Sequence, residues 1–139
     1  MERLKRAMVE IAEHIKKTAG ILDPKQVEPV LELLLNARDE GRKILIVGAG
    51  RSGLVGKSFA MRLMHLGFNV YVIGETITPS VREGDVLIAV SGSGSTQVVV
   101  TVASAAKKMK ARIVAVTSHP DSPLGRLSDY IIRIPGRTK

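Results

Sequence analysis

The sequence predicts an α/β fold in which a parallel sheet of five strands lies between two layers of helices, a three-layer α/β/α arrangement. Five short apolar runs are predicted to form buried strands, at positions 44–47, 70–73, 86–90, 113–116 and 130–134. Between them lie helical patterns at 52–66 and 96–110, and a short helix opened by Ser122 and Pro123. Strands that alternate with helices are typical of a parallel sheet wound by right-handed crossovers.

We expect the strand order 2-1-3-4-5, in which strands 1 and 3 are neighbours and their following connections leave in opposite directions. The crevice between such connections is where open α/β sheets bind their ligands. With 139 residues the chain has the length of a single domain, 1–139. We divide it into N-terminal helices at 1–41 and an α/β core at 42–139.

Two amphipathic helices are predicted before the core. Apolar residues recur at helical spacing over 4–20. A second helix is predicted over 27–40; Pro24 opens it or Pro29 restarts it, and Gly41 closes it at the C-cap.

The composition excludes several classes of function. The chain has no cysteine, which excludes disulfides, thiolate metal sites and a cysteine nucleophile. No apolar run approaches the ~18 residues of a membrane span, and the first residues do not form a signal peptide. The net charge of +8 comes from Lys and Arg scattered through every segment, with only 3% aromatic residues, which disfavours nucleic-acid binding. We therefore expect a cytoplasmic protein that binds neither nucleic acid nor membrane.

Two turns rich in glycine and hydroxyl side chains form the candidate binding site. Residues 48–53 (Gly-Ala-Gly-Arg-Ser-Gly) follow the first predicted strand, residues 91–96 (Ser-Gly-Ser-Gly-Ser-Thr) follow the third, and each turn opens a helix. Glycine lets backbone N–H groups approach an anion, and a helix N-terminus adds donors and the positive end of its dipole. Each Ser or Thr of the second turn can also donate to a phosphate oxygen. The pair of turns therefore predicts a phosphate site.

Two alternatives remain open for these turns. The first turn has the G-x-G-x-x-G pattern of a dinucleotide site, for which Glu75 could serve as the acidic ribose ligand. A dinucleotide fold, however, does not need the second turn. Either turn alone could also be an ordinary helix cap.

The helix predicted over 52–66 has two apolar faces and therefore needs two partners. One face is expected to carry Val55, Phe59 and Leu66, and the opposite face Gly53, Gly56, Ala60 and Met64. One partner is the sheet, and the other is the N-terminal helices or a second subunit. The same helix carries a polar stripe of Ser58, Arg62 and His65. This stripe either forms a polar cluster within an interface or reaches an active cleft, that of this subunit or of a neighbouring one.

Two further polar groups lie at the carboxyl ends of predicted strands, where such folds place their sites. Glu75 and Thr76 either act on a ligand or cap a turn. For His119 we favour a structural role, because its neighbours already explain a turn and a helix cap.

Four segments resemble the 6-phospho-3-hexuloisomerases, a family of the sugar isomerase (SIS) domain superfamily, which has a flavodoxin-like fold. They are the turns 48–53 and 91–94, the segment 59–68 (Phe-Ala-Met-Arg-Leu-Met-His-Leu-Gly-Phe) and the segment 74–79 (Gly-Glu-Thr-Ile-Thr-Pro). The resemblance covers the chain from about residue 44 onward, and the segment 59–68 is more specific than either glycine turn.

The resemblance implies an isomerase that needs no cofactor or metal and interconverts D-arabino-3-hexulose 6-phosphate and D-fructose 6-phosphate through an enediol, in the ribulose monophosphate pathway. By the family pattern the phosphate would be held by Ser52, Ser91, Ser93 and Thr96. The matching candidates for catalysis, by substrate contact or proton transfer, are His65, Glu75 and Arg51. A homo-oligomer, dimer or tetramer, is expected from the two-faced helix.

The sequence departs from the family pattern in two places. Members usually continue past 135–139 into a segment of the type Met-Gly-Thr-x-x-Glu, whose Glu is the expected enediol base and has no counterpart here. Without the helix that this segment begins, we expect apolar sheet surface that another subunit or the N-terminal helices must cover. The smaller departure is His119, where members often have Asn.

Other functions stay open beside the isomerase. A non-catalytic SIS module that senses a sugar phosphate is favoured by the missing Glu, and disfavoured because no helix-turn-helix is predicted before Gly41. SIS isomerases that act on arabinose or heptose phosphates are a further alternative.

Overall fold

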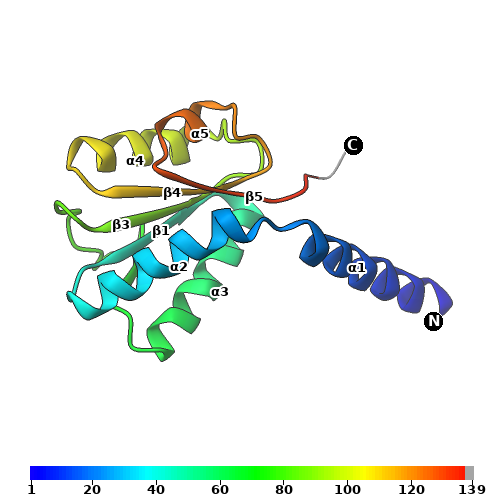
Figure 1. Ribbon diagram of the computed structural model, residues 1–139. Coiled ribbons are helices and arrows are strands. Elements are labelled where there is room, and N and C mark those ends of the chain that lie inside the picture. The colour runs from blue at the N-terminus through cyan, green and yellow to red at the C-terminus, as the bar shows by residue number, and fades with distance from the viewer. Residues whose placement is uncertain (137–139) are drawn as a thin grey trace.

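Five parallel strands form one sheet in the order β2-β1-β3-β4-β5, which confirms the predicted fold and strand order (Figure 1). The structure is a computed structural model that describes residues 1–136. Its strands are β1 (Ile44–Gly48), β2 (Val70–Val72), β3 (Val86–Val90), β4 (Arg112–Thr117) and β5 (Tyr130–Arg133).

Helices cover both faces of this sheet. One face carries α2 (Pro24–Asp39) and α3 (Gly50–His65), and the other carries α4 (Gln97–Lys108) and α5 (Pro123–Leu127) (Figure 1). The predicted boundaries hold to within a few residues. The largest difference is in α2, which begins at Pro24 and contains Pro29, because Asp23 caps it by accepting the Lys25 N–H at 2.9 Å.

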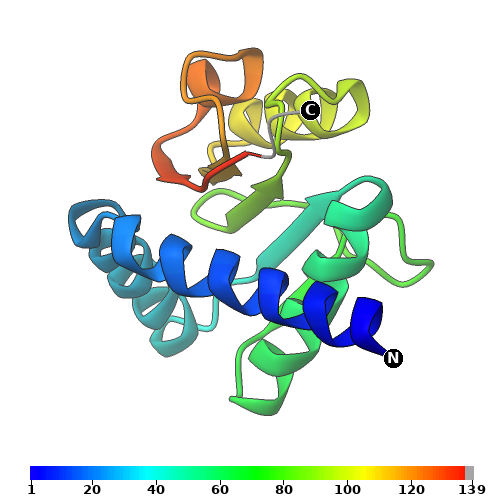
Figure 2. The same ribbon diagram turned by 90° about the vertical axis from the view of Figure 1, so that its right-hand side faces the viewer.

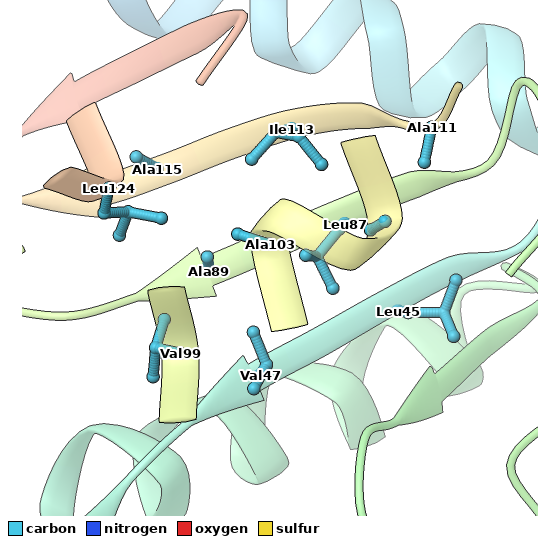
Figure 3. Close-up of a cluster of buried hydrophobic side chains, with 11 residues drawn as sticks. Leu45, Val47, Leu87, Ala89, Val99, Ala103, Ala111, Ile113, Ala115 and Leu124 are labelled. Atoms are coloured by element: carbon cyan, nitrogen blue, oxygen red, sulfur yellow. The ribbon is translucent and has the colours of Figure 1, made fainter. Parts of the chain in front are cut away.

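Each face of the sheet has its own apolar core. The core beneath α4 and α5 contains alternate residues of β1, β3 and β4 packed against small residues of α4 (Figure 3). Its members are Leu45, Val47, Leu87, Ala89, Val99, Ala103, Ala106, Ala111, Ile113, Ala115 and Leu124. The other core joins the remaining strand residues to α2 and α3, through side chains such as Leu34, Ala60 and Leu63. Strands buried on both faces explain why the sequence shows continuous apolar runs instead of alternation.

The first helix, α1 (Glu2–Ile21), packs on neither core. It projects away from the domain at the start of α2, and Figure 2 shows it in front of the domain, outside both helix layers. No residue of α1 is buried, and its predicted apolar stripe is 56–63% exposed at Leu4, Met8, Ile11 and Ile15. Within residues 1–136, no helix is both long enough and apolar enough to cross a membrane.

Helix α3 has one buried face and one exposed apolar face. Gly56, Ala60 and Leu63 are buried against the sheet. Met64 was expected on the same face as Gly56 and Ala60 but is 53% exposed, because Leu63 takes the inward position one residue earlier. The outer face is apolar as expected, and among residues 1–136 it is left uncovered at Leu54, Val55, Phe59, Met61 and Leu66.

Asp85 fixes β1 and β3 against each other at the amino-terminal edge of the sheet. One carboxylate oxygen accepts the Lys43 N–H at 3.0 Å; the other accepts the Arg82 N–H at 2.8 Å and lies 2.8 Å from Lys43 Nζ. Burial alone would raise the pKa of Asp85, but these hydrogen bonds and the Lys43 charge together hold the pKa below its ordinary value. The carboxylate therefore stabilises the register of the two strands whose far ends carry the glycine turns.

Replacing this carboxylate should destabilise the fold. Asp85→Asn leaves the Lys43 ammonium without its partner and sets an amide N–H against the Arg82 N–H, so we expect a loss of about 2–4 kcal/mol in urea unfolding at pH 7. Because the folded-state pKa is lowered, the wild-type advantage exists above the unfolded pKa of about 4 and should shrink as pH falls below it. Asp121→Asn, which removes an exposed pair with Arg126, is the control and should change stability by less than about 0.5 kcal/mol. Equal effects of the two substitutions would contradict the role of Asp85.

Candidate functional site

The two glycine turns lie side by side at the carboxyl edge of the sheet. β1 and β3 are adjacent, and their last residues, Gly48 and Val90, are register partners. The turn after β1 opens α3 on one face, and the turn after β3 opens α4 on the other. The two turns therefore lie together at the point where the connections diverge, which is the place that the strand order predicted for them; the space between residues 48–53 and 91–96 is termed the crevice.

The turn after β1 depends on close contact between its glycines. A Cβ on Gly48 would lie 2.9 Å from the Gly53 nitrogen, and a Cβ on Gly53 would lie 2.8 Å from the Gly48 carbonyl oxygen. Gly50 adopts a φ of +56° as the chain enters α3. In this tight turn Ser52 is partly buried and Arg51 is exposed.

The turn after β3 is held by its own hydroxyl groups. Ser91 Oγ accepts the Gly94 N–H at 3.0 Å and lies 2.8 Å from Thr96 Oγ1, and the Ser91 side chain is fully buried. Ser93 Oγ accepts the Ser95 N–H at 3.1 Å, which leaves the hydroxyl hydrogen of Ser93 free to donate outward. Sequence reasoning identified these residues, but it did not foresee that Ser91 is turned inward to Thr96.

The two helices that open at this crevice, like α1, lack the side-chain caps found on α2 and α5. α2 and α5 are each capped by a side chain, Asp23 and Ser122 respectively. α3 and α4 have Ala49 and Thr96 at the N-cap, and neither makes a side-chain cap hydrogen bond. The first N–H groups of two helices are therefore available at the same edge, where they favour an anion.

The turn after β4 supports the second glycine turn. Thr117 is fully buried at the end of β4, and its Oγ1 donates to the Gly92 carbonyl at 3.2 Å. The Ser118 N–H and His119 Nδ1 reach the same carbonyl oxygen, at 3.0 and 3.1 Å. His119 thus has the structural contact that the sequence favoured, whereas the contribution of Thr117 was missed, since it joins residues 25 positions apart.

The candidates for catalysis are not all brought together. Arg51 lies in the first turn of α3, and Glu75 follows β2 at the same edge of the sheet. Glu75 Oε1 lies 3.4 Å from Lys57 Nζ, and both side chains are more than half exposed. His65 ends α3, 13 residues after Ser52, so about 20 Å of helix separates it from the crevice of its own chain.

No group of three or more His, Asp or Glu side chains that could hold a metal ion occurs within the described residues. What the crevice offers is neutral hydroxyls and backbone N–H groups, with one guanidinium at its rim. These donors suit a phosphate or a carboxylate, and they provide no ligand set for a metal.

A side chain at Gly94 should destabilise the fold, whereas one at Gly92 should not. Gly94 has a φ of +69°, and a Cβ there would collide with Ser122 Oγ, so Gly94→Ala should cost about 2–4 kcal/mol in chemical unfolding. Gly92, two residues away, has no positive φ, and a Cβ added to it would meet no atom within 4 Å. Gly92→Ala should therefore change stability by less than about 0.5 kcal/mol. A Gly94→Ala protein as stable as Gly92→Ala would show that the turn is not packed as described.

Several relatives align with most of this chain. A protein of Aeropyrum pernix is 58% identical over 134 residues, which is 96% of this chain and 63% of that protein. The 3-hexulose-6-phosphate isomerase of Bacillus subtilis is 39% identical over 132 residues, which is 95% of this chain and 69% of the isomerase. The chain thus spans about two thirds of the length of these relatives.

Solved structures share the fold. A Methanococcus jannaschii protein, for which a function of 3-hexulose-6-phosphate isomerase was inferred, is 39% identical with a TM-score of 0.75, over 83% of this chain and 62% of that one. The NanR protein of Vibrio vulnificus, in complex with ManNAc-6P, is 26% identical with a TM-score of 0.80, over 96% of this chain and 51% of NanR. The SIS domain profile matches residues 38–139, and with these relatives it shows that the chain belongs to the SIS domain family.

Proposed function

We propose that this chain is an isomerase that interconverts D-arabino-3-hexulose 6-phosphate and D-fructose 6-phosphate, a reaction of the ribulose monophosphate pathway. The observation that carries the proposal is the convergence of two helix N-termini without side-chain caps and two hydroxyl-bearing turns on one crevice. The relatives named 3-hexulose-6-phosphate isomerase support the choice of substrate. A cytoplasmic location follows from a phosphorylated substrate, because its charge keeps it inside the cell.

The phosphate would be bound by neutral donors of both turns. Ser52 contributes from the first turn of α3, and Ser93 contributes its outward hydroxyl. Ser91 acts through Thr96: its buried oxygen already accepts the Gly94 N–H, so its own hydrogen is best donated to Thr96 Oγ1. The hydroxyl hydrogen of Thr96 is then free for a phosphate oxygen.

The isomerisation moves a carbonyl between C3 and C2 through an enediol. It needs a base that takes a proton from one carbon and returns it to the next, and a donor that stabilises the developing oxyanion. Arg51, at the rim of the crevice, suits the oxyanion role, and Glu75 is the nearer of the two candidate proton-transfer groups. His65 can serve only the crevice of a neighbouring subunit, given its place at the far end of α3.

An oligomer is part of this proposal. Large apolar side chains are exposed along α1 and on the outer face of α3, and apolar residues grouped on a surface mark an interaction site. We propose that the chain is a homo-oligomer, dimer or tetramer, in which another copy covers these helices. Light scattering that shows only a monomer at micromolar concentration would contradict this part.

A non-catalytic sugar-phosphate sensor is the second candidate, since NanR binds ManNAc-6P and shares the fold with 26% identity. A coupled assay separates the two candidates. The chain is mixed with 3-hexulose 6-phosphate, and fructose 6-phosphate is followed through glucose-6-phosphate isomerase and dehydrogenase. Turnover supports the isomerase. Binding of the sugar phosphate without turnover supports the sensor and overturns the isomerase.

Removing single hydroxyls from the two turns should weaken phosphate binding. Ser52→Ala and Ser93→Ala should each raise the Kd for fructose 6-phosphate by about tenfold in calorimetry, because each removes a hydrogen bond to a charged oxygen. Ser58→Ala is the control, because that hydroxyl bonds to Leu54 within α3, at 3.2 Å, and lies outside the crevice. An unchanged Kd in both turn variants would place the phosphate elsewhere.

A further inference from the structure

We infer that the turn after β4 positions a backbone donor of the phosphate site, the Ser93 N–H, and that Thr117 and His119 are positioning residues for substrate binding. This inference rests on the proposed function, since it concerns the same crevice. It adds residues that never touch the substrate and act through one peptide group.

The Gly92 carbonyl is unusually well held. Its oxygen accepts three hydrogen bonds, from Thr117 Oγ1 at 3.2 Å, the Ser118 N–H at 3.0 Å and His119 Nδ1 at 3.1 Å. A carbonyl can only accept, so the His119 ring must carry its hydrogen on Nδ1. Thr117 Oγ1 also accepts the His119 N–H at 3.2 Å, which fixes the hydroxyl and the histidine together. Three donors from one turn leave this peptide group little freedom to rotate.

The fixed carbonyl sets the direction of the next N–H group. The peptide between Gly92 and Ser93 is trans, so its N–H points opposite to its C=O. The C=O points to the turn after β4, and β4 and β1 lie on opposite sides of β3. The Ser93 N–H is therefore directed to the side of β1, where the 48–53 turn lies.

The Ser93 N–H is also available for a ligand. Ser93 donates its N–H to no acceptor within residues 1–136, whereas the neighbouring N–H groups of Gly94 and Ser95 are bonded to Ser91 and Ser93 Oγ. An N–H held toward the opposite turn can donate to a phosphate oxygen between the turns without any reorganisation on binding.

His119 offers the cleaner test, because it is exposed and its side chain can be changed without opening the core. His119→Ala removes one of the three donors, so we expect the Kd for fructose 6-phosphate and for inorganic phosphate to rise in parallel, by about tenfold. His119→Asn places an amide N–H where Nδ1 stood and should restore both values to within about threefold. The thermal midpoints of the two variants should agree within about 2 °C. His14→Ala, which removes a histidine from α1, is the matched control and should bind as the wild type does.

The outcomes separate this inference from the proposed function. Wild-type protein that binds neither fructose 6-phosphate nor phosphate overturns both. If the wild type binds and His119→Ala leaves its Kd values unchanged, the inference alone is overturned. The same holds if His119→Ala raises the Kd values and His119→Asn does not restore them. Thr117→Val, which removes the buried hydroxyl donor at similar volume, should repeat the loss of phosphate affinity, and normal affinity in that variant would again count against it.

Discussion

The parallel pairing of β1 with β3 is the constraint on which the site depends. Gly48 and Val90 are register partners at the ends of these strands, so both following turns must begin side by side. Because α3 and α4 then leave over opposite faces of the sheet, their N-termini stay at one edge with no helix between them. At the other edge, Asp85 holds the same two strands in register through Lys43 and Arg82. A shift of one residue between β1 and β3 would separate the hydroxyl groups that the proposed function brings together.

An anion site made of neutral donors needs those donors to be held in place, because each hydrogen bond contributes little if the group must first be ordered. The glycines allow close contact: Gly48 with Gly53 in one turn, and Gly94 with Ser122 beneath the other. Ser91 is buried and holds Thr96, and the turn after β4 holds Gly92. The groups proposed to face the substrate are thus supported by a second set of polar contacts. Strand β4 contributes to the proposed site through these contacts, although only β1 and β3 lead directly into it.

Much of this arrangement could be predicted from the sequence, because the relevant signals are local. Continuous apolar runs predicted strands buried on both faces, and Gly-rich turns at strand ends predicted the crevice. The bond from Thr117 to Gly92 could not be foreseen, since it depends on how two turns pack across 25 residues. The inward orientation of Ser91 likewise depends on tertiary packing, because its hydroxyl could bond either to Thr96 or to a phosphate. The distance between His65 and Ser52, in contrast, could have been worked out from helix geometry alone. Helix α1 shows the limit of sequence periodicity. The periodicity predicted the apolar stripe of α1 correctly, but it does not indicate what covers that stripe.

An oxyanion held between the two turns can be detected by NMR of the ¹⁵N-labelled chain titrated with fructose 6-phosphate, with fructose as the comparison. We expect the amide signals of residues 50–53 and of residues 93–98 to shift together with a single affinity, and fructose without its phosphate to leave them in place. Shifts confined to one turn, or gathered at the amino-terminal edge around Arg42 and Asp85, would show that the phosphate does not lie between the turns.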